Sequence, residues 1–301
     1  MGQDTRSAVP SNAPAQRITD DEFRRFRDFL YRRTGLHFAD GKRYFVDKRL
    51  LERMEATGCP SFQAYFALLR ADPGPEVQLL INRFTVNETY FFREEHQFRT
   101  LVAELLPALT AHRPGAPIRI WSMPCATGEE SYSIAIWLLE HWREVDRHEV
   151  EIIGSDIDTR TLDAAEAGYY GARALMRLSP DLVARYFEPV AVPPGSEASY
   201  RIIGDLRQSV RFTRVNLVDP VATAAYRGFD IVFCRNLLIY FDDASRRLAA
   251  EALYDSLLPG GFLCLGHSES MGRISPLFET CLLYTSPSPR DLSTSRMPSS
   301  A

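Results

Sequence analysis

Between about residue 96 and residue 284, short β-rich runs alternate with helical patterns, and this alternation constrains the fold more than any other feature. Strands that alternate with helices form a mostly parallel sheet with helices on both faces, so we predict an α/β domain. Ligands of such sheets bind beyond the carboxyl ends of the strands. The predicted strands are 118–122, 152–156, 210–217, 229–235 and 262–267, and helices are predicted between them, for example at 129–142 and 243–257.

The residues before this region predict a separate all-helical domain, residues 18–95. Its first helix begins with Thr19 and Glu22 at capping-box spacing and ends near Gly35. Residues 1–17 are rich in Ser, Pro, Ala and Gln and predict a flexible leader. Further helices are predicted at 42–56, 61–71 and 75–84.

An oversized connection, residues 169–209, separates the second predicted strand from the third. It contains the helical pattern SPDLVARYF and then PVAVPPGSEASYRII, which predicts a turn between two short strands. We therefore expect a small insertion at about residues 186–210, within a domain that spans 96–284. Residues 285–301 have almost no apolar side chains and predict a disordered tail.

The composition excludes several classes of function. A net charge of −4 and a pI near 5.9 argue against a protein whose main task is to grip nucleic acid, since that needs a basic face. The only lysines are Lys42 and Lys48, so no later lysine can serve in a P-loop or a Schiff base. The five cysteines form no CxxC pair, and we expect neither a metal site nor redox chemistry. No apolar stretch approaches the roughly 18 to 20 residues that span a bilayer, so we expect a cytoplasmic protein without membrane insertion.

The turn after the first strand, WSMPCATGEESYS at residues 121–133, indicates which ligand the sheet holds. A dinucleotide-binding turn needs three glycines so that backbone N–H groups can close on a pyrophosphate, and only Gly128 is present. Glu129 and Glu130 follow where phosphate oxygens would lie, and they would repel them. A phosphate-free adenosyl compound such as S-adenosylmethionine avoids this repulsion. The alternative is a tight strand–helix junction whose acidic first turn is favoured by the helix dipole.

The second predicted strand ends at Asp156, in the segment GSDID. An acidic residue at that position can accept hydrogen bonds from both ribose hydroxyls of an adenosyl ligand. The alternative is that Asp156 or Asp158 caps the helix that begins TRTLDAAEA. We predict the capping role for Asp158 and keep Asp156 as a site residue.

Five segments carry a resemblance to a known family: RFTVNETYFFREEHQF (83–98), IRIWSMPCATGEESYSIAIWL (118–138), IIGSDIDTRTLDAAEAGYY (152–170), FDIVFCRNLLIYFDD (229–243) and LPGGFLCLGHSES (258–270). Together they resemble the chemotaxis receptor methyltransferases, the CheR family, in order over roughly residues 18–283. The resemblance implies a Rossmann-like S-adenosylmethionine-dependent methyltransferase domain with an inserted antiparallel β-subdomain. It also implies the activity, the formation of γ-glutamyl methyl esters on the cytoplasmic helices of methyl-accepting chemotaxis receptors, with S-adenosylhomocysteine as the product. We expect a monomer.

The resemblance also implies cofactor contacts in the NETYFFR motif and at the ends of the strands: Asn87, Thr89, Arg93, Glu129, Asp156, Asn216, Leu217, Arg235 and Asn236. From the residues alone, Arg93 is either a surface arginine or a two-pronged partner of the cofactor carboxylate. Thr85 and Glu88 stand at capping-box spacing, so part of this motif could instead begin a helix. Phe91 and Phe92 are predicted to pack in the core.

The reaction explains why the sequence shows no catalytic dyad. A glutamate side chain with a pKa of about 4.3 is already an ionised nucleophile at neutral pH and needs no base. The enzyme must align the carboxylate with the methyl group and remove water from it. Tyr240, four residues after Asn236, is the candidate for orienting the incoming carboxylate, with Arg93 as the second catalytic candidate. The alternative for Tyr240 is packing at the mouth of the site.

Residues 42–53, KRYFVDKRLLER, carry five basic and two acidic side chains, a local excess of three positive charges. Since receptor methylation regions are rich in glutamate, this helix could steer the substrate electrostatically, and the alternative is an ordinary solvated helix face. The basic residues are Lys42, Arg43, Lys48, Arg49 and Arg53.

Two departures from the family pattern lead to further expectations. The turn of the insertion, VPPGSE, has only Gly195 and two prolines where some members carry a glycine-bearing loop that binds a receptor carboxyl-terminal peptide, so we expect no need for such a peptide. Sheets of this class end in an antiparallel hairpin whose first strand would be 277–284, and nothing after Thr285 is expected to supply its partner.

Two other functions remain as alternatives. A nucleic-acid amino-methyltransferase also carries a polar and an aromatic residue after the fourth strand, but it favours two prolines between them, which the stretch from Asn236 to Tyr240 lacks. A non-catalytic signalling scaffold that kept the fold is the second alternative.

Overall fold

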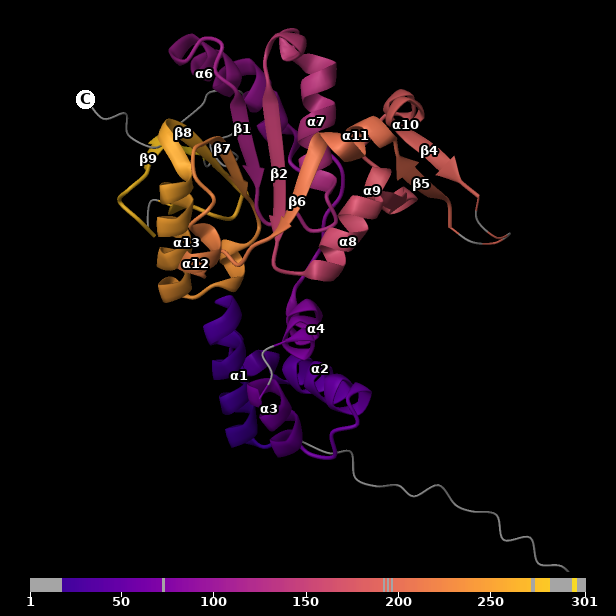
Figure 1. The fold of residues 1–301 in the computed structure, drawn as a ribbon, viewed down its shortest axis with the longest axis vertical. Helices are drawn as coiled ribbons and strands as arrows, with labels where there is room; N and C mark the ends of the chain where they lie inside the picture. Colours follow the sequence, from indigo (N-terminus) through magenta and orange to yellow (C-terminus); the bar gives the residue numbers. More distant parts are fainter. Residues whose placement is uncertain are drawn as a thin grey trace, which may run out of the picture.

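The computed structural model describes residues 18–71, 74–191, 193, 195, 197–271, 274–281 and 294–296. The first part is a bundle of helices that forms the lower unit in Figure 1. The capping box at its start is confirmed, because Thr19 N donates to Glu22 Oε2 at 2.9 Å and Glu22 N donates to Thr19 Oγ1 at 3.3 Å. Its helices are α1 (Asp20–Thr34), α2 (Arg43–Ala56), α3 (Phe62–Ala71) and α4 (Pro75–Phe84), with the short 3-10 helix η1 (Asp40–Lys42) before α2.

The second part is built on a seven-stranded sheet of order β6-β2-β1-β7-β8-β10-β9. All five predicted strands are present, and each neighbouring pair among them is parallel. Since β1 leads on one side to β2 and β6, while β7 and β8 lie on its other side, the order reverses between β1 and β7, which is where such sheets bind ligands. The strands are β1 (Ile118–Ser122), β2 (Val150–Asp156), β6 (Val210–Arg214), β7 (Phe229–Cys234) and β8 (Leu257–Leu265).

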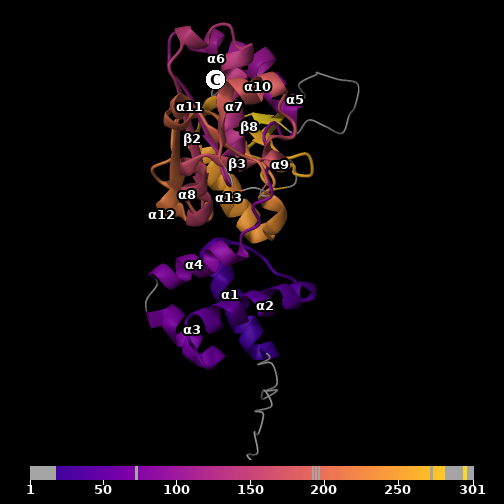
Figure 2. The same ribbon diagram turned by 90° about the vertical axis from the view of Figure 1, so that its right-hand side faces the viewer.

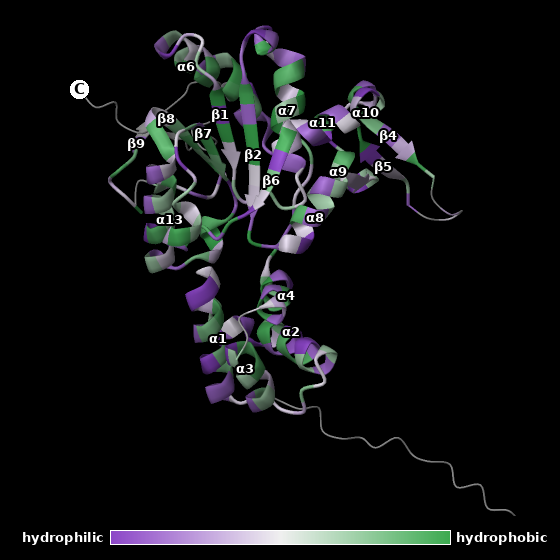
Figure 3. Ribbon diagram, viewed as in Figure 1, coloured by the Kyte–Doolittle hydropathy of each residue, from purple (hydrophilic) through white to green (hydrophobic). Residues whose placement is uncertain are grey.

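Helices cover both faces of this sheet because successive strand residues point to opposite sides. Ile120 packs in a core with Ile134 of α7 (Glu129–His141), whereas its neighbour Trp121 packs in a second core with Leu253 of α13 (Asp243–Ser256). Green, hydrophobic ribbon makes up part of β1 and of β2 in Figure 3. The other helices of this domain are α5 (Glu95–Thr100), the π-helix η2 (Leu101–Leu105), α6 (Leu106–His112), η3 (Val145–Arg147), α8 (Thr159–Ala167), α12 (Pro220–Thr223) and η4 (Leu238–Tyr240).

A small antiparallel sheet of order β3-β5-β4 is inserted between β2 and β6, which confirms the predicted β-subdomain. It begins earlier than residue 186, because its first strand is Tyr169–Gly171. The predicted helix SPDLVARYF is α10 (Pro180–Tyr186). The remaining elements are β3 (Tyr169–Gly171), α9 (Ala172–Leu175), β4 (Phe187–Val190), β5 (Ser199–Ile202) and α11 (Gly204–Ser209).

The end of the sheet corrects one prediction. The expectation that nothing after Thr285 supplies a partner strand is wrong, because β10 (Thr294–Arg296) pairs antiparallel with both β8 and β9 (Glu279–Cys281). Strand pairing uses backbone N–H and C=O groups, so a polar segment without proline can provide three residues of strand. The predicted leader 1–17 and the rest of the predicted tail, 285–293 and 297–301, lie outside the described residues. Within the described part of the chain, no helix combines the length and the apolar character that a membrane crossing requires.

The helical bundle lies beyond the carboxyl ends of the parallel strands in both Figures 1 and 2. Tyr31 of α1 donates to both carboxylate oxygens of Asp242 at 3.0 Å, and Leu36 forms a β-bridge with Phe241. Gly35, at a φ of 71°, ends α1 where a Cβ atom would lie 2.9 Å from Val218 Cγ1. The bundle therefore packs directly against the edge of the sheet where ligands are expected.

Candidate active site

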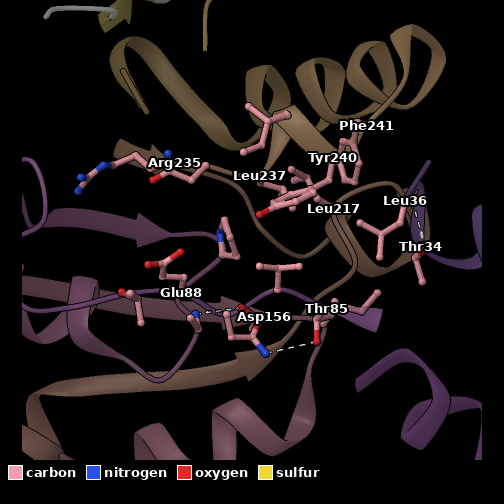
Figure 4. A pocket seen from close by; sticks show the side chains of 18 of the residues that line it. Thr34, Leu36, Thr85, Glu88, Asp156, Leu217, Arg235, Leu237, Tyr240 and Phe241 are labelled. Carbon is pink, nitrogen blue, oxygen red and sulfur yellow. Dashed lines mark hydrogen bonds between the residues drawn. The ribbon is translucent and has the colours of Figure 1, made fainter. Parts of the chain in front are cut away.

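A cavity of about 430 Å³ lies where the bundle meets the carboxyl ends of the strands. Its floor includes Met123 after β1, Asp156 at the end of β2 and Arg235 after β7. Leu36 and Phe38 of the helical bundle form part of its wall. The volume falls within the range of about 300 to 1,000 Å³ that is usual for small-molecule sites, and Figure 4 shows the side chains around it.

The structure brings nine of the ten predicted site residues together around this cavity, and the exception is Glu129. The carboxylate of Glu129 is buried and accepts a hydrogen bond from Thr127 Oγ1 at 2.6 Å, whereas Glu130 lines the cavity. Consecutive helix residues point about 100° apart, so only one of the two glutamates can face the cavity. The residues that line it are Asn87, Thr89, Arg93, Asp156, Asn216, Leu217, Arg235, Asn236 and Tyr240.

The turn before α7 makes room for this arrangement. Gly128 has a φ of 91°, and a Cβ atom there would lie 2.9 Å from Ala165 Cβ. The position is therefore closed to other residues without strain. Ala126, two residues earlier, also has a positive φ, and its N–H donates to Asp156 Oδ2 at 2.9 Å.

Asp156 lies almost fully buried at the base of the cavity. Its Oδ1 accepts a second backbone hydrogen bond, from Asp158 N–H at 2.9 Å. Burial nevertheless outweighs these bonds and raises the pKa of Asp156 to about 6. The carboxylate keeps free lone pairs for a ligand hydroxyl, since each oxygen can accept more than one bond.

Asp158 caps α8, as predicted, by accepting from Arg160 N–H at 3.0 Å and Thr161 N–H at 3.4 Å. It also accepts hydrogen bonds from Thr85 Oγ1 at 2.6 Å and Asn87 Nδ2 at 2.8 Å. The alternative that Thr85 begins a helix is wrong, because residues 85–90 are not helical and its hydroxyl is used here. The start of the NETYFFR motif is thus fastened to the end of β2.

The rest of that motif is partly core and partly cavity. Phe91 and Phe92 are buried in the core, which confirms that they pack. Arg93 is half-buried at the cavity, where its Nη1 donates to the carbonyl of Glu88 at 2.8 Å.

Arg235 is buried in a network of opposite charges. It pairs with Glu130 at 3.1 Å and with Glu94 at 3.4 Å, and it donates to the carbonyl of Arg93 at 2.6 Å. Burial raises the pKa of Glu130 although Arg235 opposes this, while for Glu94 the effect of burial is outweighed by Arg235 and His267, which lower its pKa. The Nε atom of Arg235 is buried without a hydrogen-bond partner in the described part of the chain. His267 Nδ1 lies 3.0 Å from Glu94 Oε1.

Tyr240 lies at the end of a turn that starts at Asn236, whose φ is 59°. The carbonyl of Tyr240 accepts a hydrogen bond from His37 N–H of the helical bundle at 3.0 Å. Its hydroxyl points into the cavity in Figure 4. Burial raises the pKa of Tyr240, so the hydroxyl is a proton donor at neutral pH.

Leu217, which also lines the cavity, is buried, and Asn216 Nδ2 donates to the carbonyl of Arg33 at 2.7 Å. The amide of Asn216 therefore ties the sheet domain to the end of α1.

The sequence prediction missed this bridge and the contribution of the bundle to the cavity wall. It also missed Glu130, although its position beside Glu129 was a signal, and Glu269, which lies in the quoted segment LPGGFLCLGHSES.

The cavity fits a phosphate-free adenosyl donor with positive charge. Asp156 and Glu130 bring carboxylates to the lining, which suit a positively charged donor, and the guanidinium groups of Arg93 and Arg235, which also line the cavity, suit the carboxylate of that donor. Apolar side chains such as Leu217 and Phe38 offer surface for a flat base.

Comparison with known families agrees with this fit. The CheR methyltransferase all-alpha domain matches residues 21–85, and the CheR methyltransferase SAM binding domain matches residues 87–285. The chain belongs to the CheR methyltransferase family. Within the CheR family it is 53% identical, over 87% of this chain and 89% of the relative, to "Chemotaxis protein methyltransferase 2" of Vibrio cholerae. A relative of the same name from Pseudomonas aeruginosa is 39% identical over 86% and 90% of the two chains. "Chemotaxis protein methyltransferase" of Salmonella typhimurium is 36% identical over 85% and 86%.

Proposed function

We propose that this chain is a protein-glutamate O-methyltransferase that acts on the cytoplasmic domain of methyl-accepting chemotaxis receptors and serves sensory adaptation. The observation that carries the proposal is the position of the Tyr240 hydroxyl, a half-buried donor in the same cavity as Asp156. That pairing suits a cationic adenosyl donor on one side and an anionic acceptor on the other. The names of the relatives from Vibrio cholerae and Pseudomonas aeruginosa support the link to chemotaxis.

S-adenosylmethionine, when bound, supplies a methyl group activated by a sulfonium, and S-adenosylhomocysteine is the product. In this proposal Asp156 accepts hydrogen bonds from the ribose hydroxyls and Leu217 contacts the base. We assign to Glu130 the contact that the family resemblance gave to Glu129, because Glu130 faces the cavity. The remaining cofactor contacts are assigned to Asn87, Thr89, Arg93, Asn216, Arg235 and Asn236.

The residues of this chain act on the substrate by orientation, since a carboxylate at neutral pH is already a nucleophile. Tyr240 donates its hydroxyl proton in a hydrogen bond to one carboxylate oxygen, which leaves the other oxygen directed at the methyl group. Arg93, half-buried at the same cavity, offsets the negative charge that enters. The bundle and the NETYFFR motif exclude water from the site.

Ion pairs within the chain reduce the number of basic residues around α2 that could attract the substrate. Arg43 pairs with Asp20 and Asp47, and Arg53 pairs with Glu76, so internal carboxylates already neutralise both arginines. Arg49 donates to the carbonyl of Arg83 at 2.7 Å and stays charged. Lys42 and Lys48 are exposed. We therefore propose that Lys42, Lys48 and Arg49 attract the glutamate-rich receptor.

The test is incubation of the full chain with receptor cytoplasmic fragments and labelled S-adenosylmethionine. Label that is released as methanol by mild base indicates carboxyl methyl esters, and mass spectrometry then identifies the methylated glutamates. Cofactor binding without transfer would indicate a signalling scaffold, and base-stable label on nucleic acid would indicate an amino-methyltransferase. Either result would refute the proposal.

A further inference from the structure

The side chain of Glu269 lies buried behind the turn that carries Asn236 and Tyr240. Its exposed fraction is 5%. Its Oε2 accepts hydrogen bonds from Asn236 N–H at 2.7 Å and Gly266 N–H at 3.0 Å, and its Oε1 accepts from Leu238 N–H at 2.7 Å. One carboxylate therefore joins the ends of β7 and β8 through three backbone donors.

The turn needs such an anchor because of its backbone conformation. Asn236, with its φ of 59°, is in the left-handed region that residues other than glycine rarely adopt. Hydrogen bonds from the N–H groups of Asn236 and Leu238 fix the backbone on both sides of the intervening residue. A Cβ atom at Gly266 would lie 2.8 Å from both Asn236 Nδ2 and Glu269 Oε2, so β8 closes against the turn with no free space.

The partners of Glu269 distinguish it from Glu130, a carboxylate that lines the cavity. Glu130 pairs with the guanidinium of Arg235, whereas the hydrogen bonds of Glu269 come from backbone N–H groups. A carboxylate that collects several N–H groups fixes the path of the backbone more strongly than a neutral acceptor does. The side chain at the cavity that this anchoring positions is Tyr240, which follows the anchored residues in the same turn.

We propose that Glu269 is a positioning residue, which holds the turn from Asn236 to Leu238 so that the Tyr240 hydroxyl meets the substrate carboxylate. The inference rests on the proposed methyl-transfer function. It assigns Glu269 no contact with the substrate and no proton transfer. At saturating S-adenosylmethionine, where the cofactor contact assigned to Asn236 is already made, its effect on kcat should therefore pass through Tyr240, and this is the property that the experiment measures.

The experiment is a double-mutant cycle on kcat with Glu269→Gln and Tyr240→Phe in the full chain. Glutamine has a similar shape, but its NH₂ group must face one of the backbone donors. We expect Glu269→Gln alone to lower kcat by about tenfold to 100-fold, as small misplacements of reacting groups do. In the Tyr240→Phe background it should cost less than about threefold, because coupled residues are not additive.

The matched control is Asp230→Asn. Asp230 is also buried and accepts a backbone N–H, from Arg119 at 2.9 Å, but it lies near the opposite end of β7 and pairs with Arg113. Asp230→Asn should lower the thermal stability. Any effect that it has on kcat should be the same in the wild-type and in the Tyr240→Phe background. If Glu269→Gln does not fold, Gly266→Ala presses on the same two side chains and should show the same coupling to Tyr240.

Two outcomes would overturn the inference while the wild-type chain is active. One is a double variant whose loss in kcat equals the product of the losses of Glu269→Gln and Tyr240→Phe alone. The other is a Tyr240→Phe variant with the kcat of the wild type. These outcomes would leave receptor methylation by the wild-type chain intact. A wild-type chain that transfers no methyl group to receptor fragments would refute the proposed function, and this inference with it.

Discussion

The affinity for S-adenosylhomocysteine should fall when the pH is lowered from 7 to 5, because burial raises the pKa of Asp156 to about 6. Backbone N–H groups of Ala126 and Asp158 occupy one lone pair on each oxygen, and the other lone pairs accept ribose hydroxyls best in the ionised form. Since the ligand prefers that form, its binding lowers the pKa of Asp156, and the affinity is lost as the pH falls through about 6. One unit below the pKa, a ligand that binds only the ionised form loses about tenfold in affinity, or about 1.4 kcal/mol.

Isothermal titration with S-adenosylhomocysteine at pH 7, 6 and 5 measures this effect. The ligand contributes little to the slope, since α-carboxyl and α-amino groups titrate near 3.5 and 8, outside this window. Asp156→Asn should bind weakly at every pH and lose the dependence, whereas the Asp230→Asn control should keep it. Equal wild-type affinities at pH 5 and pH 7 would refute the reasoning. A slope that persists in Asp156→Asn would move the titration to Glu130, whose pKa is also raised by burial.

Three further substitutions test other parts of the site and fold. Tyr240→Phe removes a hydrogen bond to a charged group worth about 1.5 to 3 kcal/mol, so kcat should fall by about tenfold or more while calorimetry finds unchanged cofactor affinity; unchanged turnover would exclude Tyr240 from the mechanism. Reversal of Lys42 and Lys48 to Glu should slow receptor methylation most at low salt, whereas reversal of the exposed Arg147 should not, and equal rates at all salt concentrations would exclude steering. Gly128→Ala should lower the free energy of unfolding by about 2 kcal/mol or more in denaturant titrations, because the φ of Gly128 is positive and neighbouring side chains fill the space that a Cβ atom needs. A denaturation midpoint equal to that of the wild type would contradict this.

The sheet could be predicted because its central strands are buried on both faces and therefore form runs in which most residues are apolar. β1 and β7 are examples, and each begins at the residue that was predicted. β10 was missed because the sequence criterion was side-chain polarity, whereas the pairing of Thr294–Arg296 depends on backbone groups and on distant partners.

The site could be predicted as a set of strand ends and motifs, but not in detail. Glu129 and Glu130 are equivalent in the sequence, and only the rotation of α7 determines which one faces the cavity. Glu269 lies in a segment that carries the family resemblance, but its acceptor role has no local signal, since it depends on the turn at Asn236 and its neighbours, which lie some thirty residues earlier in the chain. Interactions between segments that are far apart in the sequence are the part of a site that periodicity and spacing do not specify.

The helical bundle is a structural part of the candidate active site, and three contacts with the Tyr240 segment support this. His37 N–H donates to the carbonyl of Tyr240, Leu36 bridges Phe241, and Tyr31 holds Asp242, the cap of α13. The segment that carries the candidate catalytic hydroxyl is therefore fixed from two sides, by the bundle at one end and by the anchored turn at the other. A receptor that engages the exposed side chains of Lys42, before α2, and Lys48, on α2, would contact the same unit that fixes Tyr240. In the proposed function, attraction of the substrate and orientation of the reacting carboxylate would therefore both involve the helical bundle, and this would give a reaction without an acid–base group a use for two domains.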